Sequence, residues 1–570
     1  MDIKEQANFI WSIADLLRGN FKQSEYGKVI LPFTVLRRFD CVLAPSKEEI
    51  LERNKSLAVS NKAPIFKKYT GHDYYNVSKF DFEKLIDDSN NIDTNLKDYI
   101  NGFSDDVKEI LDNFEIATII EKLKKAGLLY LVVQKFSEIN LGADTIDNLE
   151  MGYMFEELIR KFSEQSNETA GEHFTPREVI ELMVEVLLDT DLDEITTTDG
   201  KVITILDPAC GTGGMLSIAQ NKIRALNSRT TVVPFGQELK PETYATCKSD
   251  MILKNNTNSK IVFGNSFSED GFREQKFDYI LSNPPFGVEW KKVKNFIENE
   301  SKHKGYDGRF GAGTPRISDG SLLFLQHMIS KMQPIEKGGS RIGIVFNGSP
   351  LFTGDAGSGE SEIRKWIIEK DLLEAVIGLP DQLFYNTGIS TYVWILTNRK
   401  TDRRKGKIRL INGTSFFGKM RKSLGNKRNE ITESDRKEIV RLYSTYEHDE
   451  NYIDFDNDDF GYRKITIERP LYDENREVVV EKGNPKPNSK LRDTETVPFK
   501  EDIHEYFKRE VLPHVPDAWI DEKKTKIGYE IPFTRHFYKF TPLRESSVIL
   551  DEIKQLEEKI QKSLNELFKG

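Results

Sequence analysis

Short β-branched runs alternate with helical segments between about residue 170 and residue 400, and this alternation limits the fold more than any other feature of the chain. Strands and helices that alternate over ~230 residues form a mostly parallel sheet with helices on both faces. The sequence therefore predicts a central α/β domain. Its expected strands are 202–206, 231–235, 261–263, 277–281, 341–346, 373–379 and 392–397, and its expected helices are 176–188, 214–226, 242–253, 321–332 and 360–369.

The segments on either side of this domain have other compositions. Residues 1–165 carry apolar side chains at helical spacing, with no proline after Pro64, which predicts a helical domain. Near the end of the chain, apolar residues recur in steps of three or four, which predicts an amphipathic helix; they are Ile549, Ile553, Leu556, Ile560, Leu564 and Leu567. We expect an N-terminal helical domain (1–165), the α/β domain (166–420), a mixed region with linkers (421–545) and a C-terminal helix that docks onto a partner (546–570).

The charge balance is unusual for a chain that would bind nucleic acid by itself. Lysine and arginine number 82 and aspartate and glutamate 92, which gives a net charge of −10. A nucleic-acid partner would therefore need a local basic surface or a second protein that supplies most of the contact. Residues 399–428 carry twelve cations against one acid, Asp402. Such a run is more often a solvated face than a phosphate-binding surface, and both interpretations stay open.

The sequence indicates a cytoplasmic protein without a metal site. Its first residues mix charges and lack the pattern of a signal peptide, and no apolar run approaches the roughly 18 residues that a membrane span needs. The three cysteines (Cys41, Cys210 and Cys247) are too few for a disulfide scaffold and form no CxxC pair. The eight histidines are scattered along the chain.

A glycine-rich loop follows the first predicted strand of the α/β domain. It contains Asp207, Cys210, Gly211, Thr212, Gly213 and Gly214. No Gly-Lys-Ser/Thr follows and the spacing is GxGG, which argues against a nucleoside triphosphatase and a dinucleotide site. A plain tight turn explains such a loop about as well as a ligand does. Glu238, after the next strand, can accept both hydroxyls of a ribose, so the pair indicates a nucleoside cofactor without pyrophosphate. S-adenosyl-L-methionine fits.

The sequence Asn283-Pro284-Pro285-Phe286 ends a later strand. Its prolines lack backbone donors and stiffen the turn, so a carbonyl beside the Asn283 side chain can point outward. Two oxygen acceptors aimed at one point suit an exocyclic amine, and Phe286 offers a face on which a flat base can stack. A rigid loop with an Asn-capped turn is the alternative.

A third motif covers residues 171–178. Thr175 as N-cap, Pro176 at the first helical position and Glu178 two residues later predict a capping box for the next helix. This purely structural account does not explain the presence of Glu172 and Phe174 just before the cap.

The order of these motifs resembles a known family. Phe-Thr-Pro-Arg (174–177), Asp-Pro-Ala-Cys-Gly-Thr-Gly-Gly (207–214) and Asn-Pro-Pro-Phe (283–286) are similar to the amino-group DNA methyltransferases that modify adenine at N6. The helical N-terminal region resembles, more narrowly, the modification subunit (HsdM) of type I restriction-modification systems. The resemblance covers nearly the whole chain, is most specific between Gly171 and Phe286, and implies a Rossmann-like S-adenosylmethionine-dependent methyltransferase sheet.

The resemblance also assigns roles to residues. It places the methionine end of the cofactor at the Gly211 loop and at Glu172, His173, Phe174, Thr175, Pro176 and Arg177. It places the ribose at Glu238 and the adenine of the cofactor near Asn265 and Ser266, although the family often has Asp where Asn265 stands. Asn283 and the Pro284 carbonyl would hold the N6 amine of a flipped adenine. Cys210 would be a small packing residue of the loop.

The partners implied are double-stranded DNA, a specificity subunit (HsdS) that reads its sequence, and a second copy of the chain. Whether a restriction subunit (HsdR) joins them is left open. Residues 287–318, after the catalytic loop, either close over the flipped base or form a flexible insertion.

Two other functions compete. An RNA or protein-glutamine amino-group methyltransferase generally lacks the helical N-terminal region and the Thr175-Pro176-Arg177 element. A non-catalytic assembly or DNA-clamp scaffold with the same fold is disfavoured by the intact set of Asp207, Glu238 and Asn283.

Overall fold

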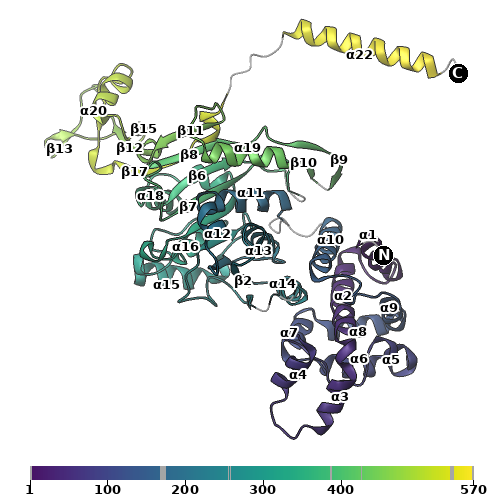
Figure 1. Cartoon of the computed structure of the whole chain (residues 1–570). Coiled ribbons are helices and arrows are strands. Elements are labelled where there is room, and N and C mark those ends of the chain that lie inside the picture. The colour runs from purple at the N-terminus through teal and green to yellow at the C-terminus, as the bar shows by residue number, and fades with distance from the viewer. Residues whose placement is uncertain are drawn as a thin grey trace. The chain divides into compact units, whose positions relative to one another are not determined.

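The computed structural model of the 570-residue chain describes residues 3–166, 175–254, 256, 258–384, 388–424, 426–538 and 545–567. The chain divides into two compact units, Met1–Ile531 and Pro532–Gly570, which are described separately. Figure 1 labels the elements of both units.

The N-terminal part of the first unit is helical, as predicted. The apolar faces of its helices form one core, and two arginines of α2 (Tyr26–Leu43) contribute polar contacts to it. Arg37 donates to the carbonyl oxygen of Ile139 (2.8 Å) and Arg38 to that of Ile146 (2.8 Å). These bonds fix the segment that leads into α10, because buried carbonyls need donors. The other helices are α1 (Ile3–Leu17), α3 (Lys47–Ser56), α4 (Ala63–Thr70), α5 (Phe82–Asp87), α6 (Ile92–Asn101), α7 (Asp105–Asn113), α8 (Ile116–Lys125), α9 (Leu129–Ser137) and α10 (Asn148–Ser166).

Nine of the described strands form one mixed sheet, in the order β11-β8-β6-β7-β5-β4-β1-β2-β3 (Figure 1). β1 is parallel to both β2 and β4, and the strand order reverses at this point, because β2 and β3 extend the sheet on one side and β4 and β5 on the other. Ligands of such sheets bind beyond the carboxyl ends of the strands at the reversal. The strands are β1 (Val202–Asp207), β2 (Thr231–Glu238), β3 (Lys260–Phe263), β4 (Tyr279–Ser282), β5 (Arg341–Asn347), β6 (Leu373–Gly378), β7 (Thr391–Thr397), β8 (Lys407–Asn412) and β11 (Tyr452–Asp456).

All seven predicted strands and all five predicted helices are confirmed, with boundaries that differ by at most three residues. β6 and β7 are buried at every position, so helices must cover both faces of the sheet. One face packs on α11, because a Cβ on Gly343 of β5 would lie 3.1 Å from Leu187. The helices of this domain are α11 (Arg177–Leu188), α12 (Leu192–Thr197), α13 (Gly214–Leu226), α14 (Pro241–Leu253), α15 (Lys294–Lys304), α16 (Ser321–Ser330), α17 (Ser349–Phe352), α18 (Gly359–Glu369) and α19 (Glu433–Ser444).

The central sheet continues past the boundary expected at residue 420. β11 pairs antiparallel with β8, and α19 packs against α11. Residue 420 itself lies in a hairpin formed by β9 (Gly418–Leu424) and β10 (Lys427–Glu430). A second, smaller sheet follows, in which β12 (Gly461–Glu468) pairs with three other strands among the described residues. Its remaining elements are β15 (Asp493–Pro498), β16 (Trp519–Ile520), β17 (Lys526–Tyr529) and α20 (Ile503–Tyr506), and β13 (Val480–Glu481) and β14 (Asn484–Pro485) form a separate hairpin.

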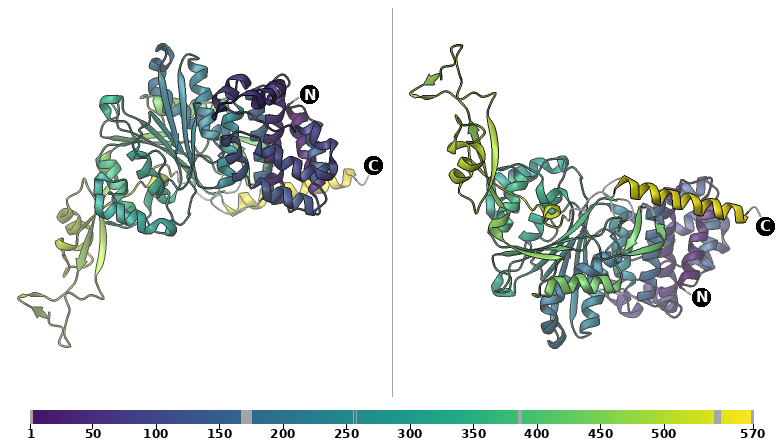
Figure 2. Two further views of the ribbon diagram at one scale, coloured as in Figure 1. Left: turned by 90° about the horizontal axis from the view of Figure 1, so that it is seen from below. Right: turned by 90° about the horizontal axis from the view of Figure 1, so that it is seen from above.

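The second unit contains α21 (Phe533–His536) and the long helix α22 (Ser546–Leu567). Figure 2 shows α22 as one unbroken helix. Six apolar side chains of α22 are exposed, at 38–58% of their surface; they are Val548, Ile549, Leu550, Ile553, Leu556 and Ile560. In the part of the chain that is described, no helix combines the length and the apolar character needed to cross a lipid bilayer.

Candidate active site

The candidate site lies where two adjacent strands of the central sheet end. β1 ends at Asp207 and β4 ends at Ser282. The Oδ1 atom of Asp207 accepts hydrogen bonds from the Ala209 N–H (3.0 Å) and the Ser282 hydroxyl (2.9 Å). Burial raises the pKa of Asp207 to about 7, because the ionised carboxylate loses its hydration. Asp207 therefore joins the two loops that the sequence singles out, and it titrates near neutral pH.

Two glycines of the loop after β1 share a left-handed backbone but differ in their surroundings. Gly211 (φ +55°) and Gly213 (φ +86°) both have left-handed backbone angles, which glycine adopts without strain. A Cβ on Gly213 would lie 2.7 Å from the Cys247 sulfur, so this glycine allows close packing. A Cβ on Gly211 would meet nothing within 4 Å, so a ligand can approach the backbone there. Thr212 lies partly exposed between them, and Gly214 begins α13.

Cys210 supports this loop from the core. Its side chain is buried, and its sulfur lies 3.9 Å from that of Cys247. The neighbouring thiol and burial raise the pKa of Cys210 well above its ordinary value, so it stays protonated and unreactive at neutral pH. This placement agrees with a packing residue.

Glu238, at the end of β2, binds the glycine loop directly. One carboxylate oxygen accepts the Gly211 N–H (3.0 Å), and the other accepts the Lys240 N–H (2.8 Å). Burial raises the pKa of Glu238 above its ordinary value. Because each carboxylate oxygen has a second lone pair, Glu238 can hold the loop and still accept the hydroxyl groups of a ligand.

Asn265 and Ser266 follow β3, the strand beside β2 at the edge of the sheet. The Ser266 hydroxyl donates to the carbonyl oxygen of Pro208 (2.5 Å), which brings the two loops together. The Oδ1 atom of Asn265 accepts the N–H of Phe267 (2.9 Å) within its own turn. The same oxygen also accepts the N–H of Ser268 (3.4 Å), so the NH2 group is the part of this side chain that is available to donate to a ligand.

Asn283, the first residue after β4, carries the most informative polar group of the site. Its Nδ2 atom donates to the Thr175 hydroxyl (2.8 Å), which fixes the plane of the amide. Its Oδ1 atom is buried and has no hydrogen-bond partner among the residues that the structure describes. Such an acceptor costs about 1–3 kcal/mol of stability. This arrangement is expected where a ligand supplies the missing donor.

The predicted capping box at the start of α11 is wrong. The helix begins at Arg177 with Pro176 as its N-cap, and no side chain caps it. Glu178 pairs instead with a lysine of β10. The Thr175 hydroxyl bonds to Asn283, so a sequence typical of a helix start provides a residue of the site.

The structure describes some, but not all, of the remaining predicted site residues. Pro284 is buried, Pro285 is half-buried, and Phe286 is only 7% exposed within the core cluster of the domain. Stacking of Phe286 on a base therefore stays a prediction that requires more of its ring to become accessible. Arg177 donates to Glu181 along the surface of α11 (3.1 Å). Glu172, His173 and Phe174 lie outside the described residues.

Sequence reasoning missed one support of the site. Residues 287–318 are docked on the domain rather than a flexible insertion, because Trp290 is 4% exposed within an apolar cluster. From this segment, Arg309 donates to the carbonyl oxygen of Ser266 (3.0 Å) and pairs with Glu300 (2.7 Å). Arg309 therefore fixes the turn after β3 from behind. No local pattern distinguishes it from the other cations of this segment.

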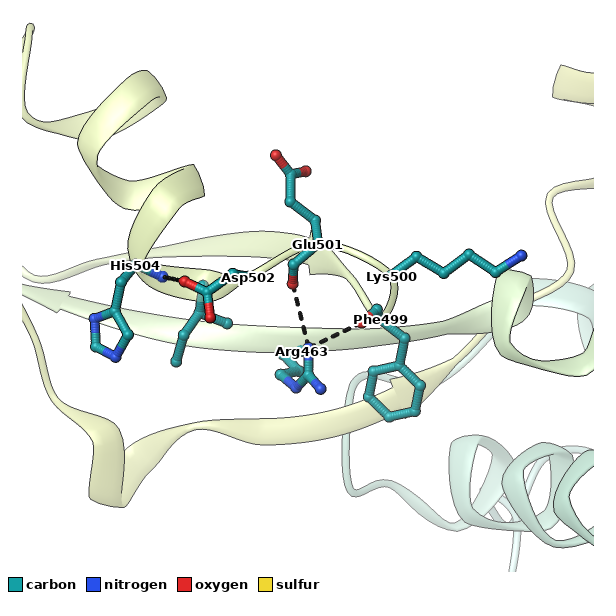
Figure 3. A pocket seen from close by; sticks show the side chains of 7 residues that line it. Arg463, Phe499, Lys500, Glu501, Asp502 and His504 are labelled. Atoms are coloured by element: carbon teal, nitrogen blue, oxygen red, sulfur yellow. Dashed lines mark hydrogen bonds between the residues drawn. The ribbon is translucent and has the colours of Figure 1, made fainter.

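A hollow of about 400 Å³ in the second sheet is lined by other residues (Figure 3). Arg463 of β12 donates there to the carbonyl oxygens of Phe499 (3.1 Å) and Glu501 (3.4 Å), and Asp502 accepts the N–H of His504 (2.9 Å). These groups satisfy one another, and none of the predicted site residues lines the hollow.

Comparisons with known proteins agree with this arrangement. The sequence model of the N-6 DNA Methylase family matches residues 147–460, and that of the HsdM N-terminal domain matches residues 6–136. The methylase subunit of the type I restriction enzyme MjaIX from Methanocaldococcus jannaschii is 26% identical over 487 residues, which are 81% of this chain and 80% of that protein.

Solved structures share the fold. The methyltransferase subunit of a type I restriction-modification system from Streptococcus thermophilus has a TM-score of 0.65 at 22% identity, over 81% of this chain and 97% of that one. A chain from a type I R-M system studied for its complex assembly and conformational transition has a TM-score of 0.51 at 19% identity, over 98% of this chain and 97% of that one. The predicted methyltransferase fold with a helical N-terminal domain is thereby confirmed. Since the first family match spans more than half of the chain and includes the loops after β1 and β4, the chain belongs to the N-6 DNA methylase family, with an HsdM N-terminal domain ahead of the methylase region.

Proposed function

We propose that the chain is the modification subunit of a type I restriction-modification complex and methylates N6 of an adenine that is flipped out of duplex DNA. The observation that carries this proposal is the Asn283 amide. Its nitrogen is held by Thr175, and its buried oxygen has no partner among the described residues. An exocyclic amine is a donor that matches this acceptor.

The residues around Gly211 fit S-adenosyl-L-methionine. The Cβ position of Gly211 is open, and Glu238 beside it retains lone pairs for ribose hydroxyls. The NH2 group of Asn265 and the loop that Ser266 joins to Pro208 would lie toward the adenine of the cofactor. When bound, the cofactor supplies an electrophilic methyl group on a sulfonium.

The chain's own residues act on the target amine by holding it. Asn283 Oδ1 accepts one N–H of the amine, and the Pro284 carbonyl accepts the other. Two acceptors in these positions orient the nitrogen lone pair toward the methyl group and stabilise the positive charge that develops on nitrogen. Phe286 stacks on the base once its ring is accessible. Thr175 prevents rotation of the Asn283 amide, so the oxygen keeps facing the amine.

The partners follow from the family and the charge. We propose that the chain binds double-stranded DNA in a complex with a specificity subunit (HsdS), a second copy of itself and a restriction subunit (HsdR), and that it acts in the cytoplasm, where its substrate DNA is found. The net charge of −10 favours a complex in which another subunit supplies much of the DNA contact. The exposed apolar face of α22 supports the C-terminal segment 546–570 as a docking element.

An RNA or protein-glutamine methyltransferase is not favoured, because the family match is to DNA methylases.

The Asn283→Ala variant tests this function. We expect methyl transfer to DNA to fall at least 100-fold, because the amine loses an acceptor that positions it. The binding of S-adenosylmethionine, measured by calorimetry, should remain unchanged, because Asn283 contacts the other substrate. The measurement is transfer of a radiolabelled methyl group to saturating cognate DNA by the complex with the specificity subunit. Equal turnover of variant and wild type would contradict the assignment.

A further inference from the structure

The basic stretch 399–428 divides into two parts that differ in what their cations contact. In the first part, Arg399 makes two hydrogen bonds to Asp191 (2.7 and 2.6 Å), and Arg409 makes two to Asp454 (2.7 Å each). Lys400, Lys405 and Lys407 form ion pairs with Asp371, Asp402 and Asp456 respectively. Arg403 and Arg404 lie over the rings of Tyr446 and Tyr443. The cations of the first part therefore already have partners within the protein.

The second part forms the hairpin of β9 and β10, which Figure 1 shows projecting from the domain. We call it the basic hairpin. Lys419 and Arg421 on β9 and Arg428 on β10 are exposed. None of the three has a carboxylate partner among the residues that the structure describes, although Lys419 lies over the ring of Phe417. The three positive charges are therefore available to a ligand.

The buried residues of β10 attach the basic hairpin to the domain. Burial alternates along this strand, so Lys427 and Asn429 face inward while Arg428 faces outward. The Asn429 side chain donates to the carbonyl oxygen of Asp381 (2.7 Å), and the backbone N–H groups of Arg428 and Asn429 donate to that of Gln382 (2.9 and 3.2 Å). The hairpin is thus held in one place, which reduces the entropy lost when its cations bind a ligand.

One of these attachments leads directly to the candidate active site. Lys427 forms an ion pair with Glu178, in the first turn of α11. Thr175 precedes that turn and accepts the hydrogen bond from Asn283 (2.8 Å). The three exposed cations are therefore carried by an element that is fastened to the helix start beside Asn283.

We propose that the basic hairpin binds the phosphate backbone of DNA next to the adenine that enters the site. This inference rests on the proposed function, because DNA must present its base to Asn283. Duplex DNA carries one negative charge per ~1.7 Å of its axis, so cations beside the flipped base meet phosphates. Guanidinium groups such as those of Arg421 and Arg428 bind phosphate oxygens in a bidentate way. In a chain of net charge −10, such a contact needs a local cluster of this kind.

The test removes the three charges together. The variant Lys419→Gln, Arg421→Gln, Arg428→Gln is assembled as the full chain with its specificity subunit and titrated with a fluorescent DNA duplex at several NaCl concentrations. For each copy of the chain that contacts DNA, the slope of log K against log salt should become less negative by about 2–3, since each lost phosphate contact contributes ~0.9. The dissociation constant should rise 10-fold or more for cognate and non-cognate duplexes alike, while S-adenosylmethionine affinity stays unchanged.

A matched control removes the same charge from another hairpin. Arg476→Gln, Lys482→Gln, Lys490→Gln neutralises three exposed cations around β13 and β14 and should leave the salt slope unchanged. An unchanged slope in the basic-hairpin variant, or an equal change in the control, would overturn the proposal. So would a loss of assembly with normal DNA binding by the complex that does form, because the hairpin would then contact the protein partner.

Two additions keep the result interpretable. If the triple variant melts below wild type, Arg421→Gln alone is measured, with an expected slope change of about 0.9. Because the titration detects binding without methyl transfer, it separates the two proposals. A wild-type complex that methylates no duplex but shows the hairpin-dependent slope would contradict only the proposed function. A complex that methylates normally with an unchanged slope would contradict only the hairpin.

Discussion

A single hydroxyl determines how the Asn283 amide is presented. Thr175 could cap α11, as threonine often does before a helix, but its oxygen instead accepts a hydrogen bond from Asn283. An asparagine side chain can present either its oxygen or its NH2 group, and only the oxygen can accept a donor from an amine. Thr175 holds the NH2 group, and therefore the oxygen remains for the target. We regard Thr175 as a positioning residue of the proposed reaction.

The Thr175→Val variant tests this role. Valine has nearly the same shape but no hydroxyl, so the Asn283 amide loses its fixed orientation. We expect the rate of methyl transfer to fall about 10-fold or more, since 1.4 kcal/mol corresponds to a factor of ten. The dissociation constant of S-adenosylmethionine should change less than threefold. Single-turnover kinetics measure the rate, and Thr175→Ser, which keeps the hydroxyl, should restore most of it. A valine variant as fast as wild type would show that Asn283 is oriented by other contacts.

The Asp207 carboxyl should make stability depend on pH. Its pKa is about 7 in the fold, against ~3.9 in an unfolded chain, so the folded state holds the proton more strongly. Its contribution is fully present below pH ~4 and is lost as the pH rises toward 7. Asparagine does not titrate, so the Asp207→Asn variant lacks this pH-dependent loss of stability. The free energy of unfolding of the variant, relative to wild type, should therefore increase by roughly 2–3 kcal/mol between pH 5 and pH 8. Urea unfolding of both ligand-free proteins measures it, and a difference independent of pH would contradict the shifted pKa.

At the scale of elements, the strands and loops that could be predicted are those that a short stretch of sequence determines by itself. Seven of the nine described strands of the central sheet were predictable because each is a short, largely apolar run, and all of these except β3 are mostly buried. The loops after β1 and β4 were predictable because glycine and proline restrict the backbone there. β8 and β11 were not predictable, because their charged residues neutralise one another only after pairing, as Arg409 does with Asp454 across the two strands. The contacts of Thr175 and Arg309 join residues far apart in the chain, and no spacing indicates such contacts.

The docked segment 287–318 should support the cofactor side of the site through Arg309. Arg309→Met keeps roughly the length of the side chain but removes the guanidinium that donates to Glu300 and to the Ser266 carbonyl. We expect the KM for S-adenosylmethionine to rise about 10-fold with a smaller change in kcat, because the turn after β3 shifts. The protein should also lose about 3–5 kcal/mol of stability, as when one partner of a buried ion pair is removed.

Arg316→Met is the matched control in the same segment. Arg316 lies 3.8 Å from Asp319 and is about half exposed, so its loss should cost less than about 1 kcal/mol. Steady-state kinetics and thermal melting compare the two variants. If Arg309→Met lowers the melting temperature with an unchanged KM, the arginine supports the fold alone.

At the scale of the whole molecule, different parts of the chain provide binding, catalysis and assembly. Asn283 and the glycine loop lie at the ends of two adjacent strands, whereas α22 belongs to a separate compact unit. Most of the stability of a helix in a protein comes from packing of its amphipathic face, and the apolar side chains of α22 whose burial is described are exposed. The periodicity of the sequence predicted this helix, but a helix pattern by itself does not identify the surface that covers it. We propose that the specificity subunit does so.

Removing Val548–Gly570 tests this assembly role. The remaining chain should melt at the wild-type temperature and bind S-adenosylmethionine with unchanged affinity, because the site and the central sheet lie within Met1–Ile531. It should no longer elute with its specificity subunit in size-exclusion chromatography, because the apolar face of α22 is gone.

The double variant Ile553→Asp, Leu556→Asp should have the same effect as the truncation, since both side chains are more than half exposed and would be buried by a partner. Changing the face opposite the apolar stripe by Glu558→Gln, Lys562→Gln should leave assembly intact, since both side chains are exposed and point away from that stripe. Full assembly of the truncated chain would show that α22 is not the interface, and early melting of that chain would show that the helix stabilises its own protein.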